Sequence, residues 1–231
     1  MNTAIIAAAG SGSRMASERP KQFLELAGKP IIFHTLKPFE ESESINEIIV
    51  VLPAEEAAGF LSMSGKLGLR KLSKVIPGGN TRADSVKRGL QAIRSATAEI
   101  VAVHDGVRPF VTVDEIERTI AKAKSTGAAI LVAPATDTIK EVSETGDVLR
   151  TLDRKLLRHA LTPQCFQFDL LRRAFERVDV EDASITDESY LIEKLGERVT
   201  IVEGSPRNMK ITTHADLLRA EAYLKAGEKD Y

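Results

Sequence analysis

Short apolar runs alternate with segments of helical spacing through the first 135 residues, and this alternation limits the folds open to the chain. Runs that predict strands cover residues 4–6, 45–52, 74–77, 99–104 and 128–133. Apolar residues at helical spacing predict helices between them, at residues 30–39, 54–69, 81–95 and 113–125. Strands separated by helices predict parallel pairing with right-handed crossovers. We therefore predict an α/β fold, with a Rossmann-like, mostly parallel wound sheet flanked by helices.

The pattern changes after residue 135, where two alternating stretches, 138–143 and 148–152, flank the turn sequence Glu-Thr-Gly-Asp. This predicts a β-hairpin, and such a hairpin folds back on its own domain or projects from it. We favour a projecting arm, about residues 136–160, that clasps a twofold partner, because isolated hairpins are marginal in water. Helices at 169–178, 186–195 and 213–226 and a strand at 199–202 then complete a single domain over residues 1–231.

Ligands of wound parallel sheets lie beyond the carboxyl ends of the strands, so the first post-strand loop is informative. Small residues replace bulky ones there, and Gly10 and Gly12 allow the backbone to approach a ligand closely. Three cations, Arg14, Arg19 and Lys21, follow within a few residues. Free amides followed by fixed positive charge indicate a polyphosphate site.

Two well-known nucleotide loops do not fit this stretch. The dinucleotide fingerprint requires a third glycine or alanine where the chain has Met15. The P-loop requires Gly-Lys-Ser/Thr, and the nearby Gly28-Lys29 runs into Pro30. The loop is therefore of another type.

Polar residues also follow the strands that end near residues 77 and 104. Residues 78–85 form a glycine-rich loop in which Asn80 or Thr81 caps a helix, and its amide and hydroxyl groups also suit the edge of a pyrimidine. Asp105 can hold Mg²⁺, or it can cap a helix or pair with Arg108. Residues 186–188 resemble an N-cap, and Lys210 falls among apolar neighbours that predict a strand.

Composition excludes several classes of function. The chain has 32 basic and 33 acidic residues and a net charge of −1, which argues against a general binder of nucleic acid or membrane surfaces. The single cysteine, Cys165, permits no internal disulfide, and the four histidines show no metal-binding pair. No targeting segment is evident and no run approaches the ~20 apolar residues of a membrane span. We expect a cytoplasmic enzyme with small anionic substrates.

A set of short motifs resembles the 2-C-methyl-D-erythritol 4-phosphate cytidylyltransferases, a nucleotidyltransferase family of non-mevalonate isoprenoid synthesis. The motifs are residues 8–15 (AAGSGSRM), 20–22 (PKQ), 79–85 (GNTRADS), 104–109 (HDGVRP), 137–140 (DTIK), 161–164 (LTPQ), 186–188 (TDE) and 208–211 (NMKI). They occur in the family's order over nearly the whole chain. The family commonly has Asp where Asn80 stands, and Asp-Ala-Ala-Arg where this chain has Asp-Gly-Val-Arg.

The resemblance implies a role for each matching position. It places the catalytic cations on Arg14, Lys21 and Lys210. It places contacts to CTP on the backbone of Ala8, Ala9, Gly10 and Gly12, together with Gly79, Asn80, Ser85 and, on the ribose side, Gly106. It places contacts to the polyol phosphate on Asp105, Arg108, Thr138, Arg154, Thr162 and Thr186, with Asp105 also beside Mg²⁺. Arg154 would reach into the neighbouring subunit of a homodimer.

The implied reaction is attack by an acceptor phosphate on the α-phosphorus of CTP with release of pyrophosphate. The acceptor's second pKa is about 6, so no general base is needed, and catalysis consists of positioning and charge neutralisation. A cytidylyltransferase for ribitol 5-phosphate would share the same CTP loop. A non-catalytic nucleotide-sensing module would lack one or more of the three cations, all of which are present.

Overall fold

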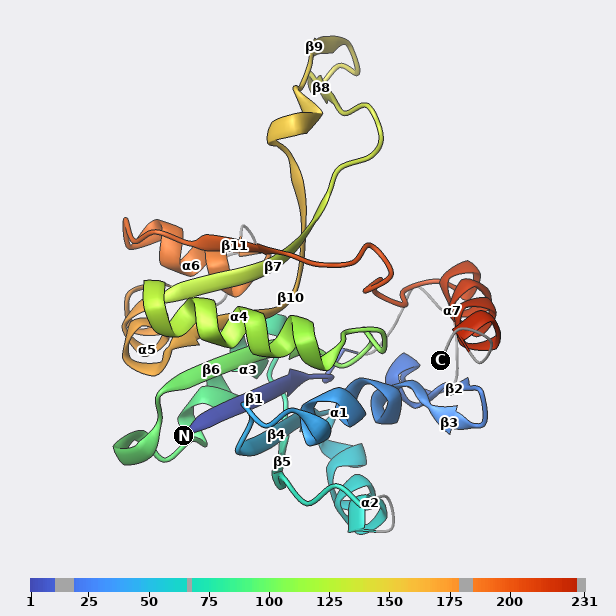
Figure 1. The fold of residues 1–231 in the computed structure, drawn as a ribbon, viewed down its shortest axis with the longest axis vertical. Helices are drawn as coiled ribbons and strands as arrows, with labels where there is room; N and C mark the ends of the chain where they lie inside the picture. Colours follow the sequence, from blue (N-terminus) through green and yellow to red (C-terminus); the bar gives the residue numbers. More distant parts are fainter. Residues whose placement is uncertain (11–18, 66–67, 179–184, 228–231) are drawn as a thin grey trace.

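The computed structural model describes residues 1–10, 19–65, 68–178 and 185–227, and its centre is a seven-stranded sheet (Figure 1). The strands lie in the order β11-β7-β10-β6-β1-β4-β5. Their bounds are β1 Asn2–Ala7, β4 Glu47–Leu52, β5 Leu72–Pro77, β6 Ile100–Asp105, β7 Ala128–Pro134, β10 Arg158–Gln167 and β11 Thr200–Glu203. The β1–β4, β1–β6, β4–β5 and β7–β11 pairs are parallel, which confirms the predicted fold class.

Helices cover both faces of this sheet, so successive residues of β1 enter different cores. Ile6 packs in a cluster with residues of α1 and α4, whereas Ile5 packs with residues of α3, α5 and α6. The helices are α1 Ile31–Glu41, α2 Ala54–Ser64, α3 Arg82–Gln91, α4 Val113–Thr126, α5 Phe168–Arg177, α6 Glu188–Lys194 and α7 His214–Gly227. Strands buried on both faces read as continuous apolar runs, which explains why the sequence reveals them.

Strand β10 is absent from the sequence-based prediction, and it runs antiparallel to both of its neighbours, β6 and β7. Pro163 lies inside it, and a proline cannot donate a hydrogen bond to a strand ladder, so the sequence carries no clear signal of a central strand there. The structure accommodates the proline where the β10–β7 register shifts, between Ala160 and Gln164. One strand therefore interrupts an otherwise parallel sheet.

The predicted hairpin is confirmed, and it projects from the body as an arm (Figure 1). Strands β8 (Lys140–Val142) and β9 (Val148–Thr151) pair antiparallel around a turn containing Gly146, whose φ is +90°. Val142, Val148 and Leu149 are each more than half exposed, and Leu156, in the short 3-10 helix Arg154–Leu156 of the arm, is 82% exposed. The arm therefore does not fold back onto its own domain.

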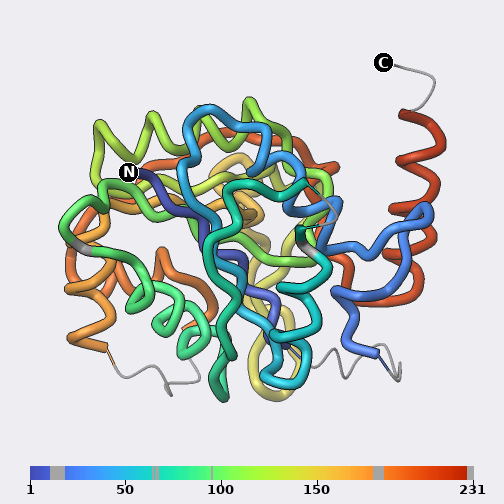
Figure 2. Tube along the Cα trace, turned by 90° about the horizontal axis from the view of Figure 1, so that it is seen from below, coloured from blue at the N-terminus to red at the C-terminus, as the bar shows by residue number. Residues whose placement is uncertain are grey.

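A small separate core joins the beginning of the chain to its end. This satellite cluster consists of buried Leu26, Ile31, Val107, Ile211 and Ala220. It packs the hairpin of β2 (Glu25–Leu26) and β3 (Lys29–Pro30) against α7, and these segments lie side by side in Figure 2. Lys21 lies just before β2, and Lys210 lies in the loop just before α7. In the described part of the chain, no helix has the length and apolar character needed to cross a membrane.

Candidate active site

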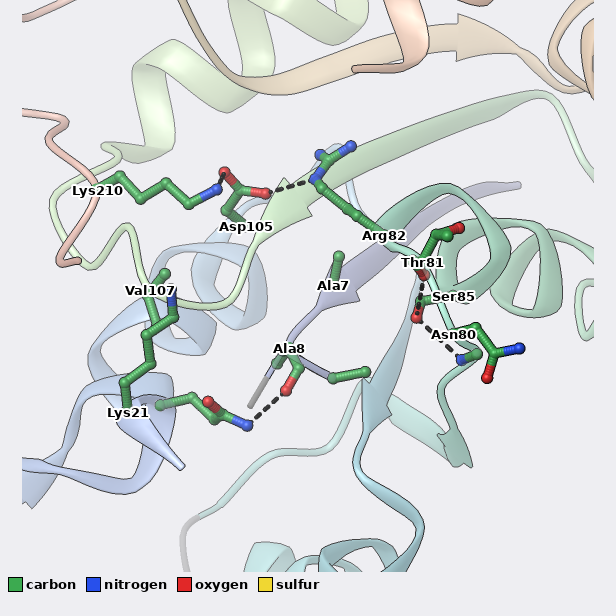
Figure 3. Close-up of a pocket in the computed structure, with 14 residues that line it drawn as sticks. Ala7, Ala8, Lys21, Asn80, Thr81, Arg82, Ser85, Asp105, Val107 and Lys210 are labelled. Atoms are coloured by element: carbon green, nitrogen blue, oxygen red, sulfur yellow. Dashed lines mark hydrogen bonds and ion pairs between the residues drawn. The ribbon is translucent and has the colours of Figure 1, made fainter. Parts of the chain in front are cut away.

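A pocket of about 410 Å³ opens beyond the carboxyl ends of β1 and β6 (Figure 3). Its lining comes from all three post-strand loops identified in the sequence and from the loop before α7. The lining residues are Ala7, Ala8, Ala9, Gly10, Lys21, Gln22, Gly79, Asn80, Thr81, Arg82, Ser85, Asp105, Val107 and Lys210. The structure therefore brings most of the predicted nucleotide-contacting positions together around one cavity.

The loops beside this pocket approach β1 so closely that glycine is required. A Cβ on Gly106 would lie 2.5 Å from the Cβ of Ala8, and one on Gly78 would lie 2.2 Å from the Cβ of Ala9. The Gly106 N–H donates to the carbonyl oxygen of Ala7 at 2.9 Å. Gly106 does not line the pocket itself, so its role here is to let the loop after β6 pack against the end of β1.

The loop before α3 is held by its own side chains. The Thr81 hydroxyl accepts from the backbone N–H of Asp84 at 3.0 Å, which confirms the predicted cap. The Ser85 hydroxyl donates to the Thr81 carbonyl at 2.9 Å and accepts from the Gly79 N–H at 3.0 Å. Asn80 is exposed and lines the pocket, so its side-chain amide is available to a ligand.

Lys21 is placed in the pocket by its neighbour Gln22. Both belong to a short 3-10 helix, Lys21–Phe23, and the side chain of Gln22 is almost completely buried. Gln22 Nε2 donates to the carbonyl oxygen of Ala8 at 2.6 Å, which ties this helix to the end of β1. Figure 3 shows Lys21 reaching up the side of the pocket on which Lys210 also lies. Gln22 is the last residue of the motif at residues 20–22, and its function as an anchor of Lys21 is visible only in the structure.

Asp105 is the charged centre of the site, and three cations surround its carboxylate. Arg82 Nε lies 3.0 Å from Oδ1, and Lys210 Nζ and Arg108 Nε lie 2.9 and 3.4 Å from Oδ2. Burial favours the neutral acid, but Arg82, Lys210 and Arg108 outweigh it and hold the pKa of Asp105 well below its usual range. Asp105 is therefore ionised. Its pairing with Arg108 is one of the three possibilities predicted for it from the sequence.

Arg82 also joins Asp105 to a second, fully buried carboxylate on α6. Its Nη1 lies 2.7 and 2.9 Å from the two carboxylate oxygens of Glu188, which is 0% exposed. Burial raises the pKa of Glu188 against the opposing effect of Arg82. Burial also disfavours the charged form of Arg82, but Glu188 and Asp105 outweigh it and raise the pKa of Arg82. Arg82 and Glu188 belong to two of the sequence motifs, at residues 79–85 and 186–188, but their pairing was not predicted.

A smaller cavity of about 240 Å³ adjoins the first and shares Arg82, Asp105 and Lys210 with it. Its lining also contains three positions that the resemblance assigns to the polyol phosphate, Arg108, Thr162 and Thr186. The predicted cap before α6 is made by Asp187, whose carboxylate accepts from the backbone N–H of Tyr190 at 3.0 Å. The two cavities together form a bipartite site with Asp105 between its parts.

Some predicted positions lie elsewhere. Thr138 and Arg154 belong to the exposed arm and line neither cavity, and Arg154 donates to the carbonyl oxygen of Thr136 at 2.8 Å. Gly12 and Arg14 fall outside the described residues. The strand predicted around Lys210 is wrong, because this segment is a loop whose apolar residue Ile211 enters the satellite cluster.

His104 is a structural residue, as predicted, and its surroundings fix its hydrogen-bonding roles. Its Nε2 lies 3.1 Å from the carbonyl oxygen of Arg108, so Nε2 carries the hydrogen. Its Nδ1 lies 2.9 Å from the Thr162 hydroxyl, which therefore donates to the ring. The same hydroxyl accepts from the Asp105 N–H at 3.2 Å. Burial lowers the pKa of His104 to about 4, so the ring is neutral near neutral pH.

Acidification should destabilise the protein partly through His104. The unfolded ring has a pKa of about 6.5, so the unfolded state binds a proton more readily than the folded state, and stability is lost as pH falls from there. Down to about pH 4, this one residue should remove roughly 3 kcal/mol from the free energy of unfolding. Urea titrations across this range should show that loss in wild type and a smaller one in His104→Gln. Equal losses in both proteins would contradict the assignment.

Asp105 provides a carboxylate that could bind a magnesium ion in the larger pocket. Among the described residues, no three His, Cys, Asp or Glu side chains are grouped to hold a metal, and Asp105 is the acidic residue that lines the larger pocket. Mg²⁺ is often held by one or two carboxylates together with substrate phosphates and water. The residues present therefore fit an ion that arrives with a triphosphate and do not form a preformed metal cage.

Comparison with known proteins gives matches over almost the whole chain. A family model described as 2-C-methyl-D-erythritol 4-phosphate cytidylyltransferase matches residues 2–226. Proteins of that name from Pelotomaculum thermopropionicum and Alkaliphilus oremlandii are 43% and 44% identical over 224 and 223 residues, each match covering 96% of this chain and 94% of the relative. The crystal structure of a 4-diphosphocytidyl-2C-methyl-D-erythritol synthase from Anaerococcus prevotii gives a TM-score of 0.87 at 32% identity, covering 97% of this chain and 96% of that one.

Proposed function

The chain belongs to the 2-C-methyl-D-erythritol 4-phosphate cytidylyltransferase family, and we propose that its bipartite site carries out that family's reaction. It is a nucleotidyltransferase that transfers a cytidylyl group from CTP to 2-C-methyl-D-erythritol 4-phosphate. The products are 4-diphosphocytidyl-2-C-methyl-D-erythritol and pyrophosphate. The observation that carries the proposal is the convergence of Lys21, Lys210 and Asp105 on one pocket at the carboxyl edge of the sheet.

The chemistry is a displacement at phosphorus between two anions. A phosphate oxygen of the acceptor forms a bond to the α-phosphorus, and the bond from that phosphorus to the β-phosphate bridging oxygen breaks. No proton needs to move, because the acceptor's second pKa is about 6. Lys21 and Lys210 would neutralise oxygens of the reacting phosphates, and Arg14 would act on the departing pyrophosphate. Fixed positive charge stabilises such a transition state without reorganisation.

The larger pocket is proposed to bind CTP. The backbone of Ala8, Ala9 and Gly10, continued by Gly12 in the sequence, would approach the triphosphate. Across the pocket, the loop of Gly79, Asn80 and Ser85 would contact the cytosine, and Gly106 would shape the ribose side. The closeness of these loops to β1 supports the assignment, because a planar base needs a narrow slot with polar edges.

The smaller cavity is proposed to bind the polyol phosphate. Arg108 and Thr186 would contact the acceptor together with Asp105, and Thr162 would contribute at the cavity wall. Asp105 would also be the protein carboxylate nearest to Mg²⁺. The bound ion would supply further positive charge to the triphosphate. The cavity's position beside Lys210 supports this arrangement, because the two substrates must meet there.

The acceptor and the nucleotide are tested by pyrophosphate release. Purified protein with Mg²⁺ should release pyrophosphate from CTP when 2-C-methyl-D-erythritol 4-phosphate is present, and much less with ATP, GTP or UTP. Faster release with ribitol 5-phosphate would identify the alternative cytidylyltransferase instead. Absence of release with either acceptor, combined with tight CTP binding, would indicate the nucleotide-sensing module.

The arm is proposed to make a homodimer, so that Thr138 and Arg154 reach the site of the neighbouring subunit. Exposed Val142, Val148, Leu149 and Leu156 support this, because a projecting apolar hairpin is poorly stable in water on its own. We place the enzyme in the cytoplasm, where its nucleotide substrate is made. The single, buried thiol of Cys165 suits a reducing compartment.

A charge placed on the arm should separate the subunits. Leu156 is 82% exposed, and Leu156→Glu should convert a dimer to a monomer in light scattering because a carboxylate would be buried at the interface. The matched control is Leu218→Glu on α7, where Leu218 is 56% exposed and the dimer should persist. Circular dichroism should be the same for all three proteins. A wild-type monomer, or a dimeric Leu156→Glu variant, would refute assembly through the arm.

A further inference from the structure

Lys210 depends on a loop without regular secondary structure for its position. The segment between β11 and α7 carries no strand or helix, and the lysine side chain is about one-third exposed. A lysine has a flexible four-carbon stem, so its ammonium is placed accurately only where the backbone beneath it is fixed. The Ile211 N–H donates to the Val107 carbonyl at 2.9 Å and fixes the residue after Lys210. The residues before it need another restraint.

Asn208 supplies that restraint from a fully buried position. It is 0% exposed, and its Nδ2 donates to the carbonyl oxygen of Thr162 on β10 at 2.8 Å. Its backbone carbonyl accepts from Nη1 of Arg108 at 2.8 Å, and its N–H donates to the Ser205 carbonyl at 3.0 Å. Two residues before Lys210, the loop is therefore attached to two different parts of the site.

The side-chain oxygen of Asn208 is left without a hydrogen bond in the described part of the protein. An unsatisfied buried acceptor destabilises the folded state, because it loses its hydrogen bonds to water on folding. A leucine of similar size would remove this oxygen, but it would also leave the Thr162 carbonyl without the Nδ2 donor. What the amide contributes here is therefore the donor that attaches the loop to β10.

The two anchors of Asn208 are also the residues that position Asp105. The Thr162 hydroxyl accepts from the Asp105 N–H at 3.2 Å, and Arg108 Nε lies 3.4 Å from Asp105 Oδ2. Lys210 Nζ in turn lies 2.9 Å from the same Oδ2. One set of contacts therefore determines the position of the carboxylate and of the lysine that faces it.

We propose that Asn208 is the positioning residue of Lys210, fixing its ammonium in the bipartite site through Thr162 and Arg108. Asn208 lines neither cavity, so it acts through Lys210 and not on a substrate. The inference rests on the proposed function, in which Lys210 neutralises the reacting phosphates. Asn208 would then affect the reaction rate without contacting either substrate.

Steady-state kinetics of Asn208→Leu test this. The variant keeps the side-chain volume and removes the donor, so kcat should fall at least 10-fold while the KM for CTP stays within twofold of wild type. Asn208→Asp, which also lacks the donor, should show the same split and provides a second readout if the leucine variant does not fold. Met209→Leu, in the same loop and half-buried, should behave as wild type.

A double-variant comparison separates positioning from general disruption. Adding Asn208→Leu to Lys210→Ala should change kcat by less than twofold, because the residue through which Asn208 acts is already gone. A further 10-fold loss in that background, or a wild-type kcat in both single Asn208 variants, would overturn the proposal. Pyrophosphate release by wild type, measured alongside, tests the proposed function separately, because it does not depend on the outcome for Asn208.

Discussion

Replacing Lys21 or Lys210 with alanine should lower kcat by about 100-fold or more, the usual effect of losing a preorganised charge contact in a transition state. Both side chains line the larger pocket, and each approaches it from a segment packed against the satellite cluster. The reaction brings a phosphate dianion towards a triphosphate, so much of the barrier is repulsion between the reactants.

The fold should survive both substitutions, which makes the kinetic loss interpretable. Without Lys210, Asp105 keeps its contacts with Arg82 and Arg108, and Gln22 still ties the Lys21 helix to Ala8. The matched control is Lys29→Ala, because Lys29 is exposed on β3 and lines neither cavity. Rates of pyrophosphate release at saturating substrates, with circular dichroism for the fold, provide the measurement. Turnover near the wild-type value in either pocket variant would remove that lysine from the mechanism.

The parts of the fold that follow hydrophobic periodicity could be predicted from sequence. The run at residues 45–52 became β4, and the helical spacing at 113–125 became α4 with its Thr112 capping interaction. Strand β10 could not be predicted in the same way, because Pro163 breaks the pattern and the register shift that tolerates it depends on β7. A strand whose pairing depends on a neighbour's geometry leaves no local signal.

The site, like the fold, has a part that could be predicted from the sequence and a part that could not. Post-strand loops follow from topology, so Ala8, Asn80 and Asp105 were expected near one another, and they are. The pairing of Arg82 with Glu188 joins residues 106 positions apart, and no spacing rule connects the first turn of α3 to the first turn of α6. Charge complementarity among residues that share a buried site becomes visible only when the chain is folded.

Replacing Arg82 should be the most destabilising single change in the site. Arg82→Met leaves Glu188 buried with no described cation beside it and removes one of the three cations around Asp105. Breaking a buried ion pair by deleting one partner typically costs about 3–5 kcal/mol, because the remaining charge is desolvated without compensation. Urea denaturation at neutral pH should show a loss of that size. A variant within about 1 kcal/mol of wild type would contradict it, since an exposed pair is worth no more than that.

Two further measurements identify Glu188 as the origin of the loss. The double variant Arg82→Met/Glu188→Leu should recover most of the stability, because apolar residues that replace a buried pair are often neutral or stabilising. The deficit of the single variant should also shrink as pH falls. Burial already raises the pKa of Glu188 and the missing cation raises it further, so the folded state binds a proton more tightly than the unfolded state. A deficit that is independent of pH and persists in the double variant would instead assign the loss to Asp105 and the pocket wall.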